Sequence, residues 1–153
     1  MRRSNQPTLL VVADESAAFS LALTYAVQQV QALHEGRVAM LCVVTPQDGI
    51  EAFGGVERAM DDEAFSRARE RIAQHEAYVK KETGKNPVVY YKKGEPRDVL
   101  LELIAQEKGI ELLVLAANTQ DMRSNPLIRY LTSDKGLRRL KVPLVILPDS
   151  LAD

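Results

Sequence analysis

The apolar run Thr8–Ala13 (TLLVVA), which ends at Asp14, decides the fold class of the chain. It is short and rich in β-branched residues, and this pattern predicts a strand buried on both faces. Apolar residues then recur at helical spacing from Ala18 to Val30, and Gly36 follows at a position suited to the end of a helix. A buried strand followed by a helix is the repeating unit of parallel α/β sheets.

The same alternation of strand and helix patterns continues along the chain. Further strands are expected at Arg37–Val44, Pro87–Lys93, Glu111–Ala117 and Val142–Leu147. After a loop over Thr45–Val56, helical patterns cover roughly Glu57–Thr83, a segment that begins at Pro96, and part of Asn118–Arg139. The last helix is the hardest to delimit, because Pro126 can begin it while Gly136 interrupts its pattern.

Five strands, the first four of which are each followed by a helix, predict an α/β fold. We expect residues 1–153 to form a single doubly wound domain with a five-stranded parallel sheet of order 3-2-1-4-5 and helices on both faces. Such sheets bind ligands in a crevice at the carboxyl ends of the strands, where the winding reverses. Asp14, Val44, Gly94 and Ala117–Thr119 are therefore expected along one edge of the sheet.

The overall composition argues against several classes of protein. The chain has 20 Lys and Arg against 21 Asp and Glu, no Trp and 5% aromatic residues, so we expect no binding to nucleic acid. Cys42 is the only cysteine, which excludes an internal disulfide. Apolar runs such as Leu112–Ala117 fall far short of the roughly 20 residues that span a bilayer, so we expect no membrane segment and a cytoplasmic location.

Motifs for catalysis are missing from the places where this fold would carry them. Asp14-Glu15-Ser16 follows the first strand instead of a glycine-rich turn, and the sequence has neither Gly-Lys-Ser/Thr nor Gly-x-Ser-x-Gly. The two histidines, His34 and His75, have no metal-ligand neighbour at useful spacing. We therefore expect no catalytic residue, no metal site and no enzymatic activity. We interpret His75 and Cys42 as packed core residues.

Several segments taken together resemble the universal stress protein family. They are Asp14-x-Ser16, Leu41–Val44, Gly94-Glu95-Pro96, Leu112–Ala117 and Lys141–Ile146, and the likeness extends from Thr8 to Pro148. The resemblance implies a small cytoplasmic α/β protein that is commonly a dimer. It also implies a protein that is induced or needed under stress, in a family without a common catalytic activity.

The resemblance further implies a candidate nucleotide site, because one branch of the family binds ATP and another does not. By resemblance, Asp14 and Val43 would hold the adenine and ribose. The phosphates in the binding branch lie on a Gly-x2-Gly-x9-Gly-Ser/Thr loop after the fourth strand, where bare backbone amides approach them. Counting back from Pro143 places the positions of this loop at Ala117, Gln120, Tyr130 and Leu131.

This chain departs from the ATP-binding pattern at that loop. The segment Ala116–Leu131 contains no glycine, and its side chains would block close approach of the backbone to phosphate. Arg123 and Arg129 are the only evident substitutes. Compared with the ATP-binding branch, the pattern indicates that this chain retains the residues that would contact adenosine and lacks those that would contact the phosphates. Asp14 also has a simpler possible role, since capping the helix that follows it is worth about 1 kcal/mol.

Three functions remain open at this point. The preferred one is a non-enzymatic stress-response protein without a cofactor, acting as a dimeric regulatory module on an unknown protein partner. The alternative is a nucleotide sensor that binds ATP or AMP through Asp14 and Val43, and the third is a slow nucleotide hydrolase, for which neither a general base nor a metal site is evident. We expect a homodimer through Val142–Leu147, because an apolar edge strand aggregates unless a second copy pairs with it.

Overall fold

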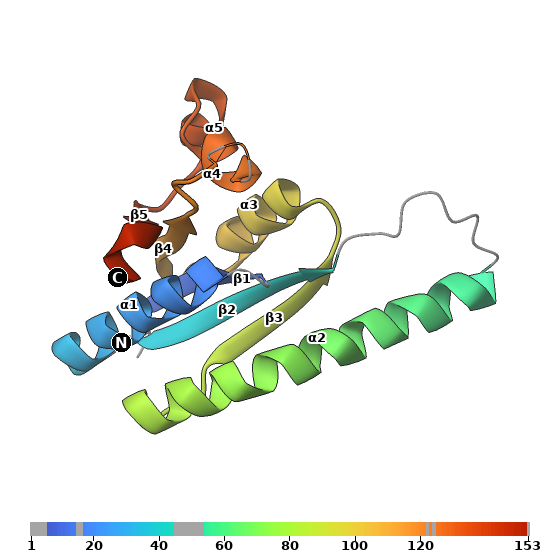
Figure 1. Ribbon diagram of the computed structural model, residues 1–153, viewed down its shortest axis with the longest axis horizontal. Helices are drawn as coiled ribbons and strands as arrows, with labels where there is room; N and C mark the ends of the chain where they lie inside the picture. The colour runs from blue at the N-terminus through green and yellow to red at the C-terminus, as the bar shows by residue number, and fades with distance from the viewer. Residues whose placement is uncertain (1–5, 15–16, 45–53, 122, 124, 153) are drawn as a thin grey trace.

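A five-stranded parallel sheet in the order β3-β2-β1-β4-β5 forms the centre of the computed structural model (Figure 1). Its strands are β1 (Thr8–Ala13), β2 (Arg37–Val44), β3 (Val88–Lys93), β4 (Ile110–Ala117) and β5 (Leu144–Pro148). The structure describes residues 6–14, 17–44, 54–121, 123 and 125–152, and for residues 17 and 54–61 it describes only the backbone. The predicted α/β class, strand order and strand direction are confirmed.

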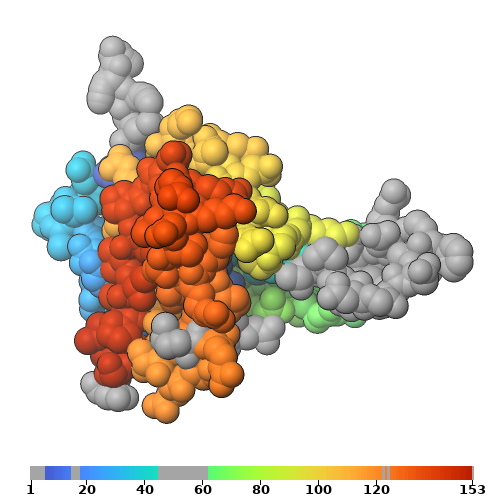
Figure 2. All heavy atoms as spheres, turned by 90° about the horizontal axis from the view of Figure 1, so that it is seen from above, coloured from blue at the N-terminus to red at the C-terminus, as the bar shows by residue number. Residues whose placement is uncertain are grey.

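Helices cover both faces of this sheet. They are α1 (Ala17–Leu33), α2 (Gly54–Thr83), α3 (Pro96–Gln106), α4 (Pro126–Leu131) and α5 (Asp134–Arg139), and a short 3-10 helix, η2 (Asp149–Ala152), follows β5. The buried residues of α1 and α2 belong to one apolar cluster, and those of α3 and α4 belong to a second cluster on the opposite face. The last third of the chain, coloured orange to red, gathers on one side of the molecule (Figure 2).

The central strand β1 contributes to both apolar clusters. Leu9 and Val11 lie in the cluster under α1 and α2, while Leu10 lies in the cluster under α3 and α4, as the alternating pleat of a strand requires. Leu10 and Val11 are completely buried. This two-sided burial is the physical reason why the run at Thr8–Ala13 is apolar at every position after its first residue.

Some element boundaries differ from the prediction. α2 begins at Gly54 rather than at Glu57, so residues 54–56 are helical and do not belong to the expected loop. Residues 45–53 of that loop lie outside the described residues. β3 begins at Val88 and β4 at Ile110, each one residue from the predicted start. These differences fall at element ends, where sequence patterns are least informative.

The boundary of β5 differs for a reason that lies in its proline. The strand covers Leu144–Pro148 instead of the predicted Val142–Leu147. Pro143 has no N–H to donate, and it contributes to the sheet through its carbonyl oxygen, which accepts a hydrogen bond from the amide of Leu113 at 3.0 Å. The strand proper therefore starts one residue after the proline.

The region for which one helix was predicted forms two short helices, α4 and α5. Ser133 caps α5, because its Oγ accepts a hydrogen bond from the amide of Gly136 at 3.1 Å and donates one to the carbonyl of Tyr130 at 2.6 Å. Gly136 lies within α5 and does not interrupt a helix. A Cβ atom at Gly136 would overlap the carbonyl group of Tyr130, so glycine allows α5 to pass close to the end of α4.

Gly94 forms the turn that brings α3 to the crevice edge. Its φ is +145°, and a Cβ there would lie 2.9 Å from Cγ2 of Val99. Its amide donates a hydrogen bond to the carbonyl of Val44 at 3.1 Å. The side chain of Glu95 then caps α3, whose first residue is Pro96.

Replacing Gly136 by alanine is expected to lower the free energy of unfolding by about 1–3 kcal/mol, because the added methyl group must displace the backbone at the end of α4. Gly109→Ala is the matched control. A Cβ at Gly109 would lie 3.7 Å from Oγ1 of Thr8, an ordinary contact, so the change in stability should be below about 1 kcal/mol. Urea denaturation measures both variants. Equal stability of the two would contradict the close packing of α4 and α5.

Candidate functional site

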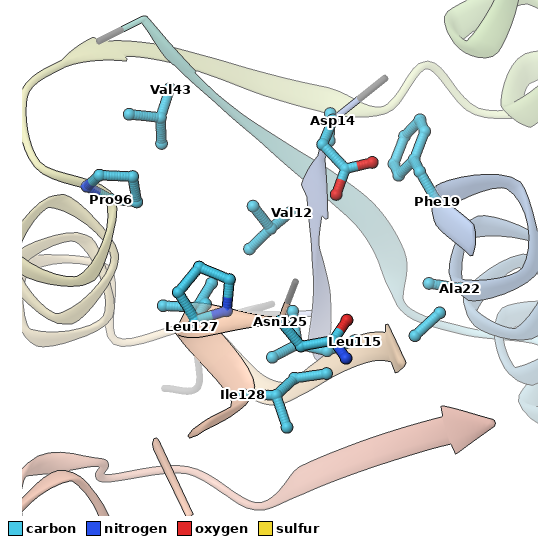
Figure 3. Close-up of a pocket in the computed structure, with 13 residues that line it drawn as sticks. Val12, Asp14, Phe19, Ala22, Val43, Pro96, Leu115, Asn125, Leu127 and Ile128 are labelled. Atoms are coloured by element: carbon cyan, nitrogen blue, oxygen red, sulfur yellow. The ribbon is translucent and has the colours of Figure 1, made fainter. Parts of the chain in front are cut away.

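A cavity of about 340 Å³ lies at the carboxyl ends of β1, β2 and β4, where the winding of the sheet reverses. The strand ends supply Val12, Ala13, Asp14, Val43, Leu115 and Ala116, and the surrounding segments supply Phe19, Ala22, Pro96, Asn125, Pro126, Leu127 and Ile128. Figure 3 shows the cavity between the end of β1, α1 and the start of α4. Its volume falls in the range of about 300–1,000 Å³ that is usual for small-molecule sites.

Asp14 and Val43, the two residues predicted to contact adenosine, both line this cavity. Asp14 directly follows β1 and is exposed, and it lies beside Phe19 of α1 (Figure 3). Val43 is half-buried near the end of β2, which pairs in parallel with β1. An apolar cavity with a carboxylate at its edge suits a flat heteroaromatic ligand that carries N–H or O–H donors. The alternative role of Asp14 as a helix cap involves residues 15 and 16, which lie outside the described part of the chain.

The four positions predicted for a phosphate loop do not line the cavity. Ala117 and Leu131 are buried in the apolar cluster under α3 and α4, with 4% and 0% of their surface exposed. Gln120 is exposed, and Tyr130 is half-buried. The count from Pro143 used the spacing of the family's loop, whereas in this fold Tyr130 and Leu131 belong to α4 and pack against the cluster under α3 and α4.

Tyr130 lies among three helices, α3, α4 and α5. The guanidinium group of Arg97 lies over its ring at 4.5 Å from the centroid, and Nη1 of Arg139 donates a hydrogen bond to its hydroxyl at 2.6 Å. Each arginine also faces a carboxylate: Arg97 is 3.8 Å from Glu95, and Arg139 is 4.0 Å from Asp98. The positive charge of this cluster is therefore balanced, and Tyr130 serves as a packing contact.

The sequence patterns do not indicate which helical residues form the wall of the cavity. Phe19 comes from α1, Pro96 from the start of α3, and Leu127 and Ile128 from the first turn of α4. The available signal was Pro126, because a helix that begins there places its first turn beside the end of β4.

The segment after β4 uses its own side chains to bind its backbone amides. The amide of Asn118 donates to Oδ1 of Asn125 at 3.0 Å, and Nδ2 of Asn125 donates back to the carbonyl of Asn118 at 3.0 Å. The amide of Gln120 donates to Oδ1 of Asn118 at 3.0 Å, and the amide of Arg123 donates to Oδ1 of Asp121 at 3.1 Å. These amides therefore already have acceptors within the chain.

Thr119 in the same segment is bound to a residue that follows β5. Its hydroxyl donates a hydrogen bond to Oδ1 of Asp149 at 2.5 Å, and its amide donates to the same oxygen at 3.3 Å. The hydrogen bond from the Thr119 hydroxyl is the main reason why the pKa of Asp149 lies below its usual range. Asp149 is therefore a carboxylate at neutral pH.

Of the two residues interpreted as core positions, Cys42 is buried and His75 is half-buried. The ring of His75 meets the ring of Phe19 edge-on at 4.8 Å, and burial lowers the pKa of His75. Cys42 is buried in β2, and burial raises the pKa of its thiol against the opposing effect of Arg71. Within the described ranges, no group of three or more His, Cys, Asp or Glu is placed to hold a metal ion. Among the same residues, no helix is both long and apolar enough to cross a bilayer.

A family comparison covers almost the whole of this fold and its cavity. The model of the Universal stress protein family matches residues 7–148. The chain belongs to the universal stress protein family. No curated protein matches the chain closely enough to be compared with it.

Solved structures share the universal stress protein fold at low sequence identity. Universal stress protein UspA from Lactobacillus plantarum is 19% identical with a TM-score of 0.75, and the match covers 95% of this chain and 99% of that one. The universal stress protein from Archaeoglobus fulgidus in complex with dAMP is 17% identical with a TM-score of 0.62, covering 92% and 95%. A universal stress protein family protein from Arabidopsis thaliana with AMP bound is 15% identical with a TM-score of 0.59, covering 93% and 91%.

We expect this universal stress protein to bind ATP with a dissociation constant weaker than about 100 μM, which corresponds to about −5.5 kcal/mol. A triphosphate needs several converging donors, and the described amides after β4 already donate within the chain. The guanidinium groups of Arg123 and Arg129 do not line the cavity, and the side chain of Arg123 is 90% exposed. Calorimetry at moderate salt measures the constant. Micromolar ATP binding that is lost in Asp14→Ala would contradict this prediction.

Proposed function

We propose that this universal stress protein is a cytoplasmic, non-enzymatic stress-response module that binds the adenosine part of a nucleoside or mononucleotide. The observation that carries the proposal is the cavity that brings Asp14 and Val43 together at the carboxyl edge of the sheet. The similarity in fold to structures that hold dAMP and AMP supports the choice of adenosine as ligand.

The cavity walls suit the two parts of adenosine. The apolar side chains of Val43, Pro96 and Leu127 provide surfaces against which a purine ring can be buried. Asp14 can accept hydrogen bonds from ribose hydroxyls or from an exocyclic amino group, and a hydrogen bond to a charged group is worth about 1.5–3 kcal/mol. The ligand is thus held by burial of its base and by one oriented carboxylate.

The polar groups that line the cavity favour ligand binding over catalysis. Asp14 and Asn125 are the polar side chains among the described residues that line it. The amide group of Asn125 is hydrogen bonded to the backbone of Asn118 through both its oxygen and its nitrogen. Asp14 is the one carboxylate among the described lining residues, and the proposal assigns it to the ligand's hydroxyl or amino groups and not to the activation of a water.

Adenosine at a hundred times its dissociation constant is expected to raise the free energy of unfolding by about 2.7 kcal/mol, which thermal denaturation detects as a shift of several degrees. Asp14→Ala should weaken binding at least about tenfold, because it removes the carboxylate acceptor. Glu111→Ala is the matched control, since Glu111 is exposed near the start of β4, at the opposite edge of the sheet. No shift with either adenosine or AMP at millimolar concentration would contradict the proposed function.

We also propose that the protein is a homodimer through β5. The dimer would act as a regulatory module on a further protein partner. Within the described residues, the two edge strands β3 and β5 each pair with a single neighbour. β3 ends in the exposed Lys92 and Lys93, and charged residues at an edge discourage pairing with another copy. β5 has no charged residue, and its Ile146 is 37% exposed. β5 is therefore the edge that suits pairing with a second copy.

Light scattering is expected to give twice the chain mass of 17.0 kDa at micromolar concentration, and Ile146→Lys should shift the protein toward the monomer. Ile146 is a better test position than Val145, because Val145 packs against the cluster under α1 and α2 and its replacement would also disturb the core. Lys92→Ala on the opposite edge is the control. A monomeric wild-type protein would refute the dimer.

A further inference from the structure

Phe19 forms part of the cavity wall that α1 supplies. Its side chain lines the cavity together with that of Ala22, which lies about one turn further along the same helix. Figure 3 shows the ring of Phe19 beside Asp14, the carboxylate proposed to bind the ligand. An aromatic side chain in a cavity wall is packed by protein atoms on one side only, so other rotamers are open to it. The shape of the cavity therefore depends on what holds this ring from behind.

The ring of His75 packs against Phe19 from the neighbouring helix, α2. The two ring centroids are 4.8 Å apart and the ring planes meet at 81°, which is the edge-to-face arrangement that aromatic pairs prefer. His75 is half-buried, and burial lowers the pKa of its imidazole, so the ring is uncharged at neutral pH. His75 is not among the described residues that line the cavity. It therefore touches the wall and leaves the ligand to Phe19.

A second contact between α1 and α2 lies away from the cavity. The hydroxyl of Tyr78 donates a hydrogen bond to Oγ1 of Thr24 at 3.5 Å. Each member of this pair comes later in its helix than Phe19 and His75 do, and neither is among the described lining residues. The two helices thus meet through one aromatic contact at the cavity and through another contact further along, which allows the two to be tested separately.

We propose that His75 is a positioning residue for the ligand, because it holds the ring of Phe19 in the cavity wall, where that ring borders a bound purine. This inference rests on the proposed function and adds a residue of α2 to its site. Without the contact, the Phe19 ring spends part of its time in rotamers that narrow the cavity. The apparent affinity then falls in proportion to the fraction of molecules in which the cavity is open.

Calorimetry with adenosine on the full chain tests the proposal through the ring at position 75. His75→Leu keeps an apolar side chain and removes the aromatic edge, so the dissociation constant for adenosine should rise about three- to tenfold, as the loss of an aromatic pair predicts. His75→Phe keeps an aromatic ring beside Phe19, so its dissociation constant should stay within about twofold of the wild-type value.

Tyr78→Leu is the matched control. It makes the same kind of replacement on the same helix, at the contact with α1 that lies away from the cavity. It should lower the free energy of unfolding, because it removes a half-buried ring, and it should leave the dissociation constant for adenosine within about twofold. Thermal denaturation of both leucine variants shows that each is folded and compares their losses of stability.

A double-mutant cycle tests whether His75 acts through Phe19. Phe19→Leu should itself weaken the binding of adenosine, because it removes the ring from the cavity wall. Adding His75→Leu to that variant should change the dissociation constant by less than about twofold, since the ring that His75 positions is already gone. Additive effects of the two substitutions would show that His75 acts by another route, and they would refute the proposal.

The possible failures are distinguishable. If the wild-type protein and His75→Leu bind adenosine equally well, the role of His75 is refuted while the proposed function stands. If Tyr78→Leu or His75→Phe weakens binding as much as His75→Leu does, the effect is a general loss of packing and the role of His75 is again refuted. If the wild-type protein does not bind adenosine, both the proposed function and this inference fail.

Discussion

The burial of β1 between two apolar clusters holds the two halves of the sheet together. Leu10 and Val11 are completely buried on opposite faces, and full burial of each such side chain is worth roughly 1.5–3 kcal/mol. β2 and β4 pair with the two edges of β1, so the chain must wind outward in both directions from this strand. Asp14 follows β1 at the place where the winding of the chain reverses direction. The cavity opens at this place because no single crossover helix lies over the strand ends on both sides of it.

The character of the cavity depends on where hydrogen bonds are already made. The walls are apolar, and the polar groups next to them are largely used inside the chain, as the reciprocal bonds between Asn118 and Asn125 show. A segment that satisfies its amides with its own side chains gains rigidity and gives up the ability to hold an anion. These internal hydrogen bonds and the absence of glycine from Ala116–Leu131 are the two grounds for the prediction that the chain binds ATP weakly.

The sequence predicts the sheet well because strands that are buried on both faces must be apolar at nearly every position. Asp14 could be placed at the crevice because it follows a predicted strand, and the ends of parallel strands share one edge, whereas Val43 was assigned through the family resemblance. Tyr130 and Leu131 lie away from the cavity because both belong to α4, where Leu131 is buried in the cluster under α3 and α4 and the ring of Tyr130 packs against Arg97 and Arg139. The bond between Thr119 and Asp149 also escaped prediction, since a contact between side chains distant in sequence leaves no periodic signal.

The order of the strands has a consequence for how the molecule forms. β1, β2 and β3 pair in the order in which they are made, but Thr8 finds Ile110 of β4 only after roughly a hundred further residues. During synthesis, one edge of β1 stays open until β4 emerges, and closing this long loop is the slowest kind of contact to make. The cavity takes one wall from each half of the sheet, so it does not exist in a chain whose second half has yet to dock. A ligand that fits it therefore binds the finished fold and no earlier intermediate.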